Sequence, residues 1–195
     1  MSSGLVFYWL SWIYFVCALF FMEPSKRQWF FMYWILILIS TSNMFISIGM
    51  LDFSVAYFIL FLGSLMFLLQ ANHRFFYFFV SFTIAIAYAS FLVWEHETPL
   101  LLIFPKYVVL PSFIVLIAIF LTKEYMKRCF VALLGICGGE LLYHISLFDY
   151  AYYNTMGNEV FLDLCTIIIG VLFVIALYEY IIDRLFMMFS RIKQR

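Results

Sequence analysis

Charged residues are scarce in this sequence. They make up 11% of the 195 residues, while hydrophobic residues make up 67%, and soluble domains carry roughly a quarter charged residues. The 11 basic and 11 acidic side chains balance, so no net charge points to nucleic acid or to an acidic partner. A soluble chain of this length has no way to bury so much apolar surface. The composition therefore excludes a cytosolic globular domain, a disordered chain and a collagen-like fibre, and favours a polytopic membrane protein.

Motifs that carry chemistry are also lacking. We find no nucleotide-binding loop, low-complexity tract or internal repeat. No basic residue precedes the first apolar run, so we expect a retained helix rather than a cleaved signal peptide. The cysteines form no CxxC pair, so we expect neither a disulfide nor a zinc site from Cys17, Cys129, Cys137 and Cys165. We expect no cofactor and no metal.

Long apolar runs dominate the sequence instead. A helix needs about 20 apolar residues to cross a hydrocarbon core ~30 Å thick. Seven runs approach this length, and the second is separated from the third at Gly49-Met50-Leu51-Asp52, where glycine permits a turn. We therefore predict an all-α transmembrane helix bundle in a single membrane domain, 1–195, with spans at 5–22, 29–50, 53–71, 75–94, 100–122, 130–148 and 160–182.

The basic residues alternate from loop to loop. All but Lys106 lie in the first, third and fifth loops and the C-terminal tail, whereas the N-terminus and the other loops hold none. The positive-inside rule then predicts an outer N-terminus and a cytoplasmic C-terminus, which requires an odd number of helices. We expect these residues to anchor the topology at the lipid surface: Lys26, Arg27, Arg74, Lys123, Lys127, Arg128, Arg184, Arg191, Lys193 and Arg195.

The C-terminal tail, 183–195, continues the periodicity of the last span. Apolar residues recur at helical spacing and arginines occupy another face. This pattern predicts a basic amphipathic segment on the inner leaflet, with binding of a partner as the alternative.

Small and polar residues within the spans indicate where helices pack. Lipid tails are as apolar as leucine, so helices associate through close contacts and polar groups. Gly135 and Gly139 form a GxxxG pair in the sixth span, and the fourth span carries small residues every four positions, Ser81, Ala85 and Ala89. We expect these faces to pack in the interior. We expect Asn43, in the second span, to face another helix or line a polar cavity.

Four ionisable residues fall inside predicted spans. At ~1.5 Å per residue, Glu140 lies ~12 Å from the outer face, Lys106 ~9 Å and Asp163 ~5 Å. His144 lies one turn outward from Glu140 on the same helix face. We expect Glu140 to pair with Lys106 or His144, either as a structural ion pair or as a proton- or ligand-binding site open to the outside. Asp163 is alternatively an interfacial residue at a helix start.

Neither a catalytic nor a metal site follows from these residues. Cys137 and His144 share a stripe but lie seven residues apart, or ~10 Å along the helix, whereas a nucleophile and its base need ~3 Å. A metal site at Glu140 and His144 lacks an evident third ligand. Glu95-His96-Glu97, in the fourth loop, is interpreted as a solvated loop, with a weak external cation or proton site as the alternative.

Several segments are similar to a known family. They are Phe7-Tyr8-Trp9-Leu10-Ser11-Trp12, Phe20-Phe21-Met22 with Ser25-Lys26-Arg27, Gly135 to Gly139 followed by Glu140-Leu141-Leu142-Tyr143, and Phe161-Leu162-Asp163. They resemble the YphA-type membrane proteins of Bacillus-like bacteria over most of the chain. No activity is assigned to that family, so the resemblance implies a small bacterial inner-membrane protein and carries over no catalytic residue.

Three hypotheses of function follow. The first is a non-enzymatic structural or interaction component of the envelope of a bacterial cell, located in the cytoplasmic membrane. The second is a small-solute or proton-linked carrier that uses Lys106, Glu140, His144 and Asp163. The third is a membrane-embedded enzyme. The expected partners are the lipid bilayer and either another membrane protein or a second copy of the chain, with no nucleic acid.

Overall fold

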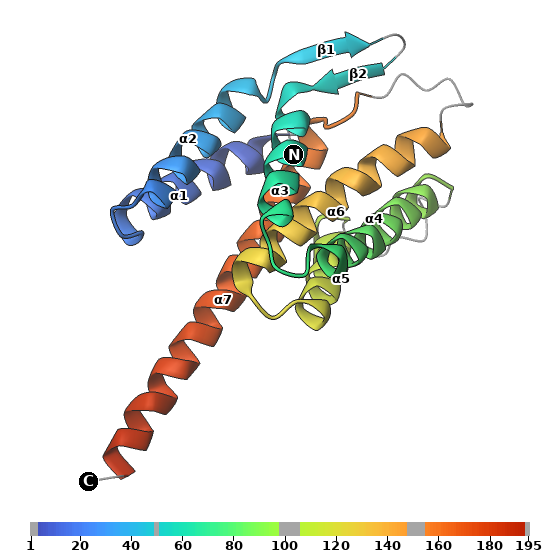
Figure 1. Cartoon of the computed structure of the whole chain (residues 1–195). Coiled ribbons are helices and arrows are strands. Elements are labelled where there is room, and N and C mark those ends of the chain that lie inside the picture. Colours follow the sequence, from blue (N-terminus) through green and yellow to red (C-terminus); the bar gives the residue numbers. More distant parts are fainter. Residues whose placement is uncertain (1–3, 49–50, 98–105, 148–154, 194–195) are drawn as a thin grey trace.

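The computed structural model describes residues 4–48, 51–97, 106–147 and 155–193, and this part of the chain is almost entirely helical (Figure 1). A short antiparallel hairpin, β1 (Phe45–Ile48) and β2 (Leu51–Ser54), interrupts the helices. The seven helices are α1 (Leu5–Phe21), α2 (Lys26–Thr41), α3 (Val55–Leu69), α4 (Arg74–Glu97), α5 (Lys106–Leu121), α6 (Tyr125–Ser146) and α7 (Glu159–Lys193).

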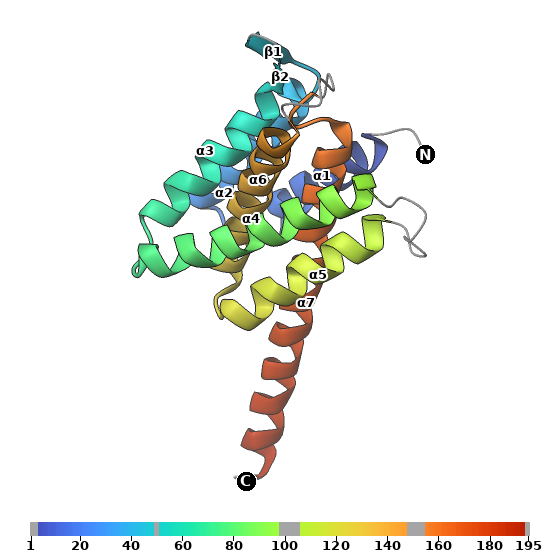
Figure 2. The ribbon, with the colours of Figure 1, turned by 90° about the vertical axis from the view of Figure 1, so that its right-hand side faces the viewer.

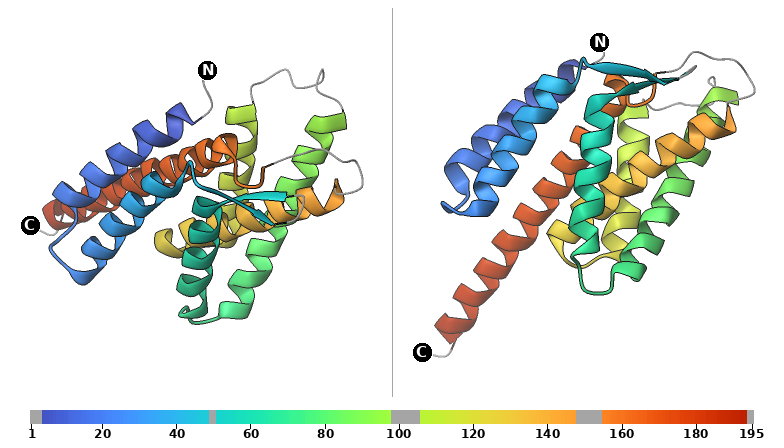
Figure 3. Two further views of the ribbon diagram at one scale, coloured as in Figure 1. Left: turned by 90° about the horizontal axis from the view of Figure 1, so that it is seen from above. Right: turned by 45° about the horizontal axis from the view of Figure 1, so that its top comes forward.

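Helix α6 forms the centre of the bundle. It packs against α3, α4, α5 and α7, and most of its residues from Arg128 to Glu140 are buried. The pair α1 and α2 lies to one side, where α1 packs along α7 and α2 reaches α3 (Figure 3). Successive helices run in opposite directions, so the start of α7 lies at the same end of the bundle as the hairpin (Figures 1 and 3).

The closest helix approach is between α6 and α4. A Cβ atom at Gly135 would lie 2.6 Å from Ile84 Cγ2, and one at Gly139 would lie 2.8 Å from the carbonyl oxygen of Ala85. Only glycine leaves room for contacts this close. Ser81 and Ala85 are buried on the facing side of α4, and Ala89 is half-buried.

The second helix is shorter than expected, and this corrects the predicted span 29–50. Helix α2 ends at Thr41, where the hydroxyls of Thr41 and Ser42 donate to the carbonyls of Ile37 and Ile39. Such local bonds compete with a continuing helix. The next residues, rich in phenylalanine and isoleucine, form β1 instead. Asn43 lies exposed in the turn between α2 and β1 rather than against another helix. The expected break at Gly49-Met50 lies outside the described residues.

A short segment ties the hairpin to the start of α7. The backbone of Met156 accepts from Ser54 N at 2.9 Å and donates to Asp52 O at 2.8 Å. Next to it, Gly157 has φ +70°, and a Cβ there would lie 2.5 Å from Tyr57 Cβ, so the position requires glycine. This connection fixes the residues that precede α7.

The helices differ in their capacity to cross a bilayer. By length and composition, α4, α6 and α7 are long and apolar enough, and α1, α3 and α5 are shorter apolar helices. Helix α7 has 35 residues, or ~52 Å at ~1.5 Å per residue, and its C-terminal half extends beyond the other helices (Figure 2). Helix α7 therefore includes most of the predicted C-terminal tail, 183–195. Residues 98–105, which include the start of the predicted fifth span, lie outside the described residues.

Candidate ligand-binding cavity

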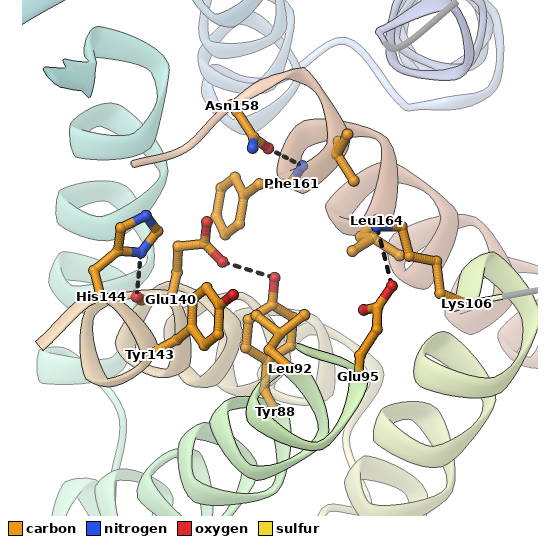
Figure 4. Close-up of a pocket in the computed structure, with 11 residues that line it drawn as sticks. Tyr88, Leu92, Glu95, Lys106, Glu140, Tyr143, His144, Asn158, Phe161 and Leu164 are labelled. Carbon is orange, nitrogen blue, oxygen red and sulfur yellow. Dashed lines mark hydrogen bonds and ion pairs between the residues drawn. The ribbon is translucent and has the colours of Figure 1, made fainter. Parts of the chain in front are cut away.

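A cavity of about 390 Å³ lies between the end of α4, the start of α5, the end of α6 and the start of α7 (Figure 4). Charged and polar side chains share its wall with aromatic and aliphatic ones. The lining residues are Tyr88, Leu92, Glu95, Lys106, Glu140, Tyr143, His144, Asn158, Val160, Phe161 and Leu164. Three of the four ionisable residues predicted to form a polar site line this one cavity: Lys106, Glu140 and His144. The fourth, Asp163, is not among its lining residues.

Glu140 is held in place by a tyrosine of the neighbouring helix. Its side chain is only 4% exposed, and Tyr88 Oη donates to its Oε2 at 2.9 Å. The contact depends on the close approach of α4 and α6, because a Cβ atom at the adjacent Gly139 would lie 2.7 Å from Tyr88 Cδ1. The glycine stripe of α6 therefore positions a hydrogen-bond donor on the carboxylate.

His144 presents a buried nitrogen with no partner. Its side chain is 7% exposed, and Nδ1 lies 2.9 Å from the carbonyl oxygen of Glu140. Because a carbonyl oxygen only accepts, Nδ1 carries the hydrogen, and in the neutral ring Nε2 is then an acceptor. Within the described residues Nε2 is buried and makes no hydrogen bond. Such orphaned acceptors are uncommon in folded proteins.

Lys106 pairs with Glu95 rather than with Glu140. The Nζ to Oε1 distance is 3.3 Å, and both side chains are partly exposed. Figure 4 shows this pair on the opposite side of the cavity from Glu140, with Leu92 between them. The two charged regions of the wall are therefore separated by an apolar stretch.

Three polar lining residues were not considered as site residues in the sequence: Tyr88, Tyr143 and Asn158. Glu95 was considered only within Glu95-His96-Glu97, as a solvated loop or a weak external cation or proton site. Helix α4 runs to Glu97, beyond the predicted end at residue 94, and this continues the face of Tyr88 and Leu92 to Glu95. The spacing of four and then three residues from Tyr88 to Leu92 to Glu95 is the sequence pattern that could have placed these side chains on one helix face. Asn158 was recognisable only as a candidate helix cap, and its Oδ1 accepts from Phe161 N at 2.9 Å.

Asp163 has a separate role at the start of α1. Its side chain is 2% exposed, and its two oxygens accept from Gly4 N at 2.9 Å and Phe7 N at 2.7 Å. These backbone amides have no partner within their own helix. A carboxylate of α7 thus caps the N-terminus of α1, rather than the start of its own helix.

The predicted anchors differ in exposure. Lys26, Arg27, Arg74, Lys123 and Arg184 are exposed, and Lys127 pairs with Glu124. Arg191 and Lys193 belong to α7, and Arg195 lies outside the described residues.

Arg128 is buried rather than facing lipid. It is 4% exposed and donates to the carbonyls of Thr122 and Lys123 and, at 3.3 Å, to Glu179 Oε1. It connects the end of α5 to α7 through the start of α6.

Comparison with known proteins yields a family and no nearer relative. A family model described as YphA-like integral membrane protein matches residues 3–195. No curated protein and no solved structure matches the chain. The family indicated by the sequence segments is thereby confirmed.

Proposed function

The chain belongs to the YphA-like integral membrane protein family, and from this premise we propose that it binds a small solute within the membrane and acts as its carrier. The observation that carries the proposal is the cavity of about 390 Å³ with Glu95, Lys106, Glu140 and His144 in its wall. Its volume lies within the range of small-molecule pockets, about 300–1,000 Å³. Its mixture of apolar and a few convergent polar groups is also typical of them.

The arrangement of the charges favours binding over a purely structural ion pair. A structural pair inside a membrane is expected to be direct and closely packed, because burial of each charge is costly. Glu140 is instead buried beside open volume, and the lysine of the cavity, Lys106, pairs with Glu95. His144 adds an orphaned nitrogen at the same cavity. These features are expected where a ligand completes the site.

The proposal includes a topology. Seven spans, an outer N-terminus and a cytoplasmic C-terminus in one membrane domain place the cavity in the outer half of a bacterial cytoplasmic membrane. The charge alternation of the loops supports this. The alternating direction of the helices supports it too, because the cavity is lined where α4 and α6 end and where α5 and α7 begin, and the proposed topology places these ends outside. Figure 1 shows the end of α6 and the start of α7 on the side of the hairpin.

A structural or interaction role is the second candidate function. The observation that favours it is the extension of α7, where large apolar side chains such as Tyr178, Ile181 and Leu185 are exposed. A second copy of the chain or another membrane protein would be its partner. The enzyme hypothesis has no comparable support, since Cys137 is not among the residues that line the cavity.

Solute binding is tested with the full chain purified in detergent. A panel of small cationic, anionic and neutral solutes is screened for an increase in Tm, since a ligand at a hundred times its Kd stabilises by about 2.7 kcal/mol. Leu92→Trp fills the cavity, and Ile86→Trp adds the same ring at an exposed position of the same helix. We expect hits to stabilise the wild type and Ile86→Trp but not Leu92→Trp, and to be taken up by proteoliposomes.

Two results contradict the proposal. One is a panel in which no solute raises Tm. The other is a set of hits that stabilise Leu92→Trp as much as the wild type, which would place their binding outside the cavity.

A further inference from the structure

The charges around the cavity do not balance. Lys106 is bridged by Glu95 at 3.3 Å, so these two side chains neutralise each other. The hydrogen bonds to the Glu140 side chain come from neutral donors, the hydroxyl of Tyr88 and the backbone amide of Gly157. Among the described residues that line the cavity, no lysine or arginine remains to compensate Glu140, and His144 compensates it only when its ring is protonated. When Glu140 is ionised and His144 is neutral, the cavity therefore carries one uncompensated negative charge.

The hydrogen-bonding groups point to the same deficit. Glu140 offers carboxylate oxygens, and neutral His144 offers Nε2, which is buried without a partner. Both are acceptors. The two residues lie one helical turn apart on the same face of α6, and both line the cavity. What this corner of the cavity lacks is a group with several N–H donors and a positive charge.

The remaining wall suits an organic cation better than a hydrated metal ion. The rings of Tyr88, Tyr143 and Phe161 line the cavity, and aromatic faces attract cations. Leu92, Val160 and Leu164 supply apolar surface. A bare inorganic ion would leave most of the roughly 390 Å³ unfilled and the apolar wall without a partner.

We propose that the solute is a small organic ammonium ion with a short apolar body, whose ammonium group binds between Glu140 and His144. The inference rests on the proposed function and specifies its substrate class. An ammonium group supplies three donors and the missing charge. Its hydrocarbon part then lies along Leu92 and Leu164, towards the Lys106–Glu95 pair.

The experiment compares four probes of similar length on the purified full chain: butylammonium, 4-aminobutyrate, butyrate and 1-butanol. Affinity is measured by calorimetry and by the shift in Tm. We expect butylammonium to bind and butyrate and 1-butanol to bind at least ten times more weakly. We expect 4-aminobutyrate to bind no more tightly than butylammonium, because Glu95 already occupies Lys106.

Variants separate the acceptor pair from the rest of the wall. Glu140→Gln keeps an acceptor for Tyr88 but removes the charge, and we expect butylammonium affinity to fall roughly ten- to a hundredfold. His144→Phe keeps a ring but removes Nε2, and we expect it to lower the butylammonium affinity less than Glu140→Gln does. Glu23→Gln, an exposed carboxylate between α1 and α2, is the matched control and should bind as the wild type does. The Tm of each variant without ligand shows whether it is folded.

Failure of this inference and failure of the proposed function give different results. If butyrate, 1-butanol or 4-aminobutyrate is preferred and Leu92→Trp abolishes its binding, the cavity binds solutes but the ammonium assignment is wrong. The assignment is also wrong if Glu140→Gln binds butylammonium with wild-type affinity. If no probe and no solute of the wider panel binds, both proposals fail.

Discussion

At the scale of single residues, two buried charged groups are satisfied by partners in other helices. Asp163 accepts hydrogen bonds from Gly4 N and Phe7 N at the start of α1, and Arg128 donates to Glu179 of α7 as well as to two carbonyls in the turn before its own helix. Spacing along one helix does not reveal the contacts between helices, because each joins two different elements. The sequence identified four ionisable residues whose burial in a membrane costs free energy, Glu140, His144, Lys106 and Asp163, but it did not identify their partners.

Removal of the Asp163 carboxylate should release the start of α1. Asp163→Ala leaves two buried amides without an acceptor, so we expect the free energy of unfolding to fall by about 1–3 kcal/mol. Asp163→Asn, which keeps one acceptor oxygen, should lose less. Denaturation in detergent measures both, with Asp183→Ala, an exposed carboxylate of the same helix, as the control. Equal stability of Asp163→Ala and the control would contradict the capping role.

The hydroxyl of Tyr88 should matter more than its ring. Tyr88→Phe keeps the packing against Gly139 but removes the donor to Glu140, and a buried carboxylate without that donor should cost about 1–3 kcal/mol. Thermal denaturation checks this, and Tyr33→Phe makes the same deletion at an exposed position of α2. A Tyr88→Phe variant with the same Tm as the wild type would show that this hydrogen bond to Glu140 does not stabilise the fold.

At the scale of elements, the pairing of α4 with α6 builds the site. The two helices approach closely along Gly135 and Gly139, and this brings Tyr88 onto Glu140. The sequence indicated both small-residue faces. It did not indicate the end of α2 or the hairpin, because the run up to residue 50 holds no charged residue, and apolar content alone does not distinguish a buried helix from a strand. Hydroxyl bonds at Thr41 and Ser42, and pairing with β2, decided that boundary.

A bulky residue at the α4–α6 contact should disrupt the bundle. In Gly139→Leu the new side chain meets Tyr88 and the backbone of Ala85 at once, so we expect a loss of about 3 kcal/mol or more and poor expression. Gly138→Ala is the control, because its Cβ would lie 3.4 Å from Ala85 Cβ, an ordinary contact. It should be neutral or stabilising by up to about 1 kcal/mol. Expression and Tm measure both, and wild-type values for Gly139→Leu would refute the close approach.

At the scale of the whole molecule, the helices form one bundle from which α7 extends (Figure 2). Helices of the lengths of α1, α2, α3 and α5 rise only ~23–26 Å at ~1.5 Å per residue, somewhat less than a hydrocarbon core of ~30 Å. Interfacial side chains or local thinning of the bilayer would accommodate the difference. The proposed orientation of the bundle rests on the charges of its loops rather than on its packing.

The proposed topology predicts which loops face the outside. In a chain without native cysteines, Asp52→Cys should react with a membrane-impermeant maleimide in intact bacterial cells. Lys123→Cys should react only after permeabilisation, because the fifth loop is expected on the cytoplasmic side. Both positions are exposed. The reverse pattern would invert the topology, and labelling of both in intact cells would change the number of spans.

By itself, the sequence determined the class of protein and the elements from which it is built. Its 67% hydrophobic and 11% charged residues required a membrane protein, helical periodicity and small residues indicated helices that pack, and several segments indicated the family. Only the tertiary structure decided which rare polar groups meet. It joined Lys106 to Glu95, Tyr88 to Glu140 and Asp163 to α1, and within the described part of the chain it left His144 Nε2 without a partner. The physical reason is that periodicity orders side chains around one helix axis, whereas a site between helices depends on how closely and at what height each helix packs against the next.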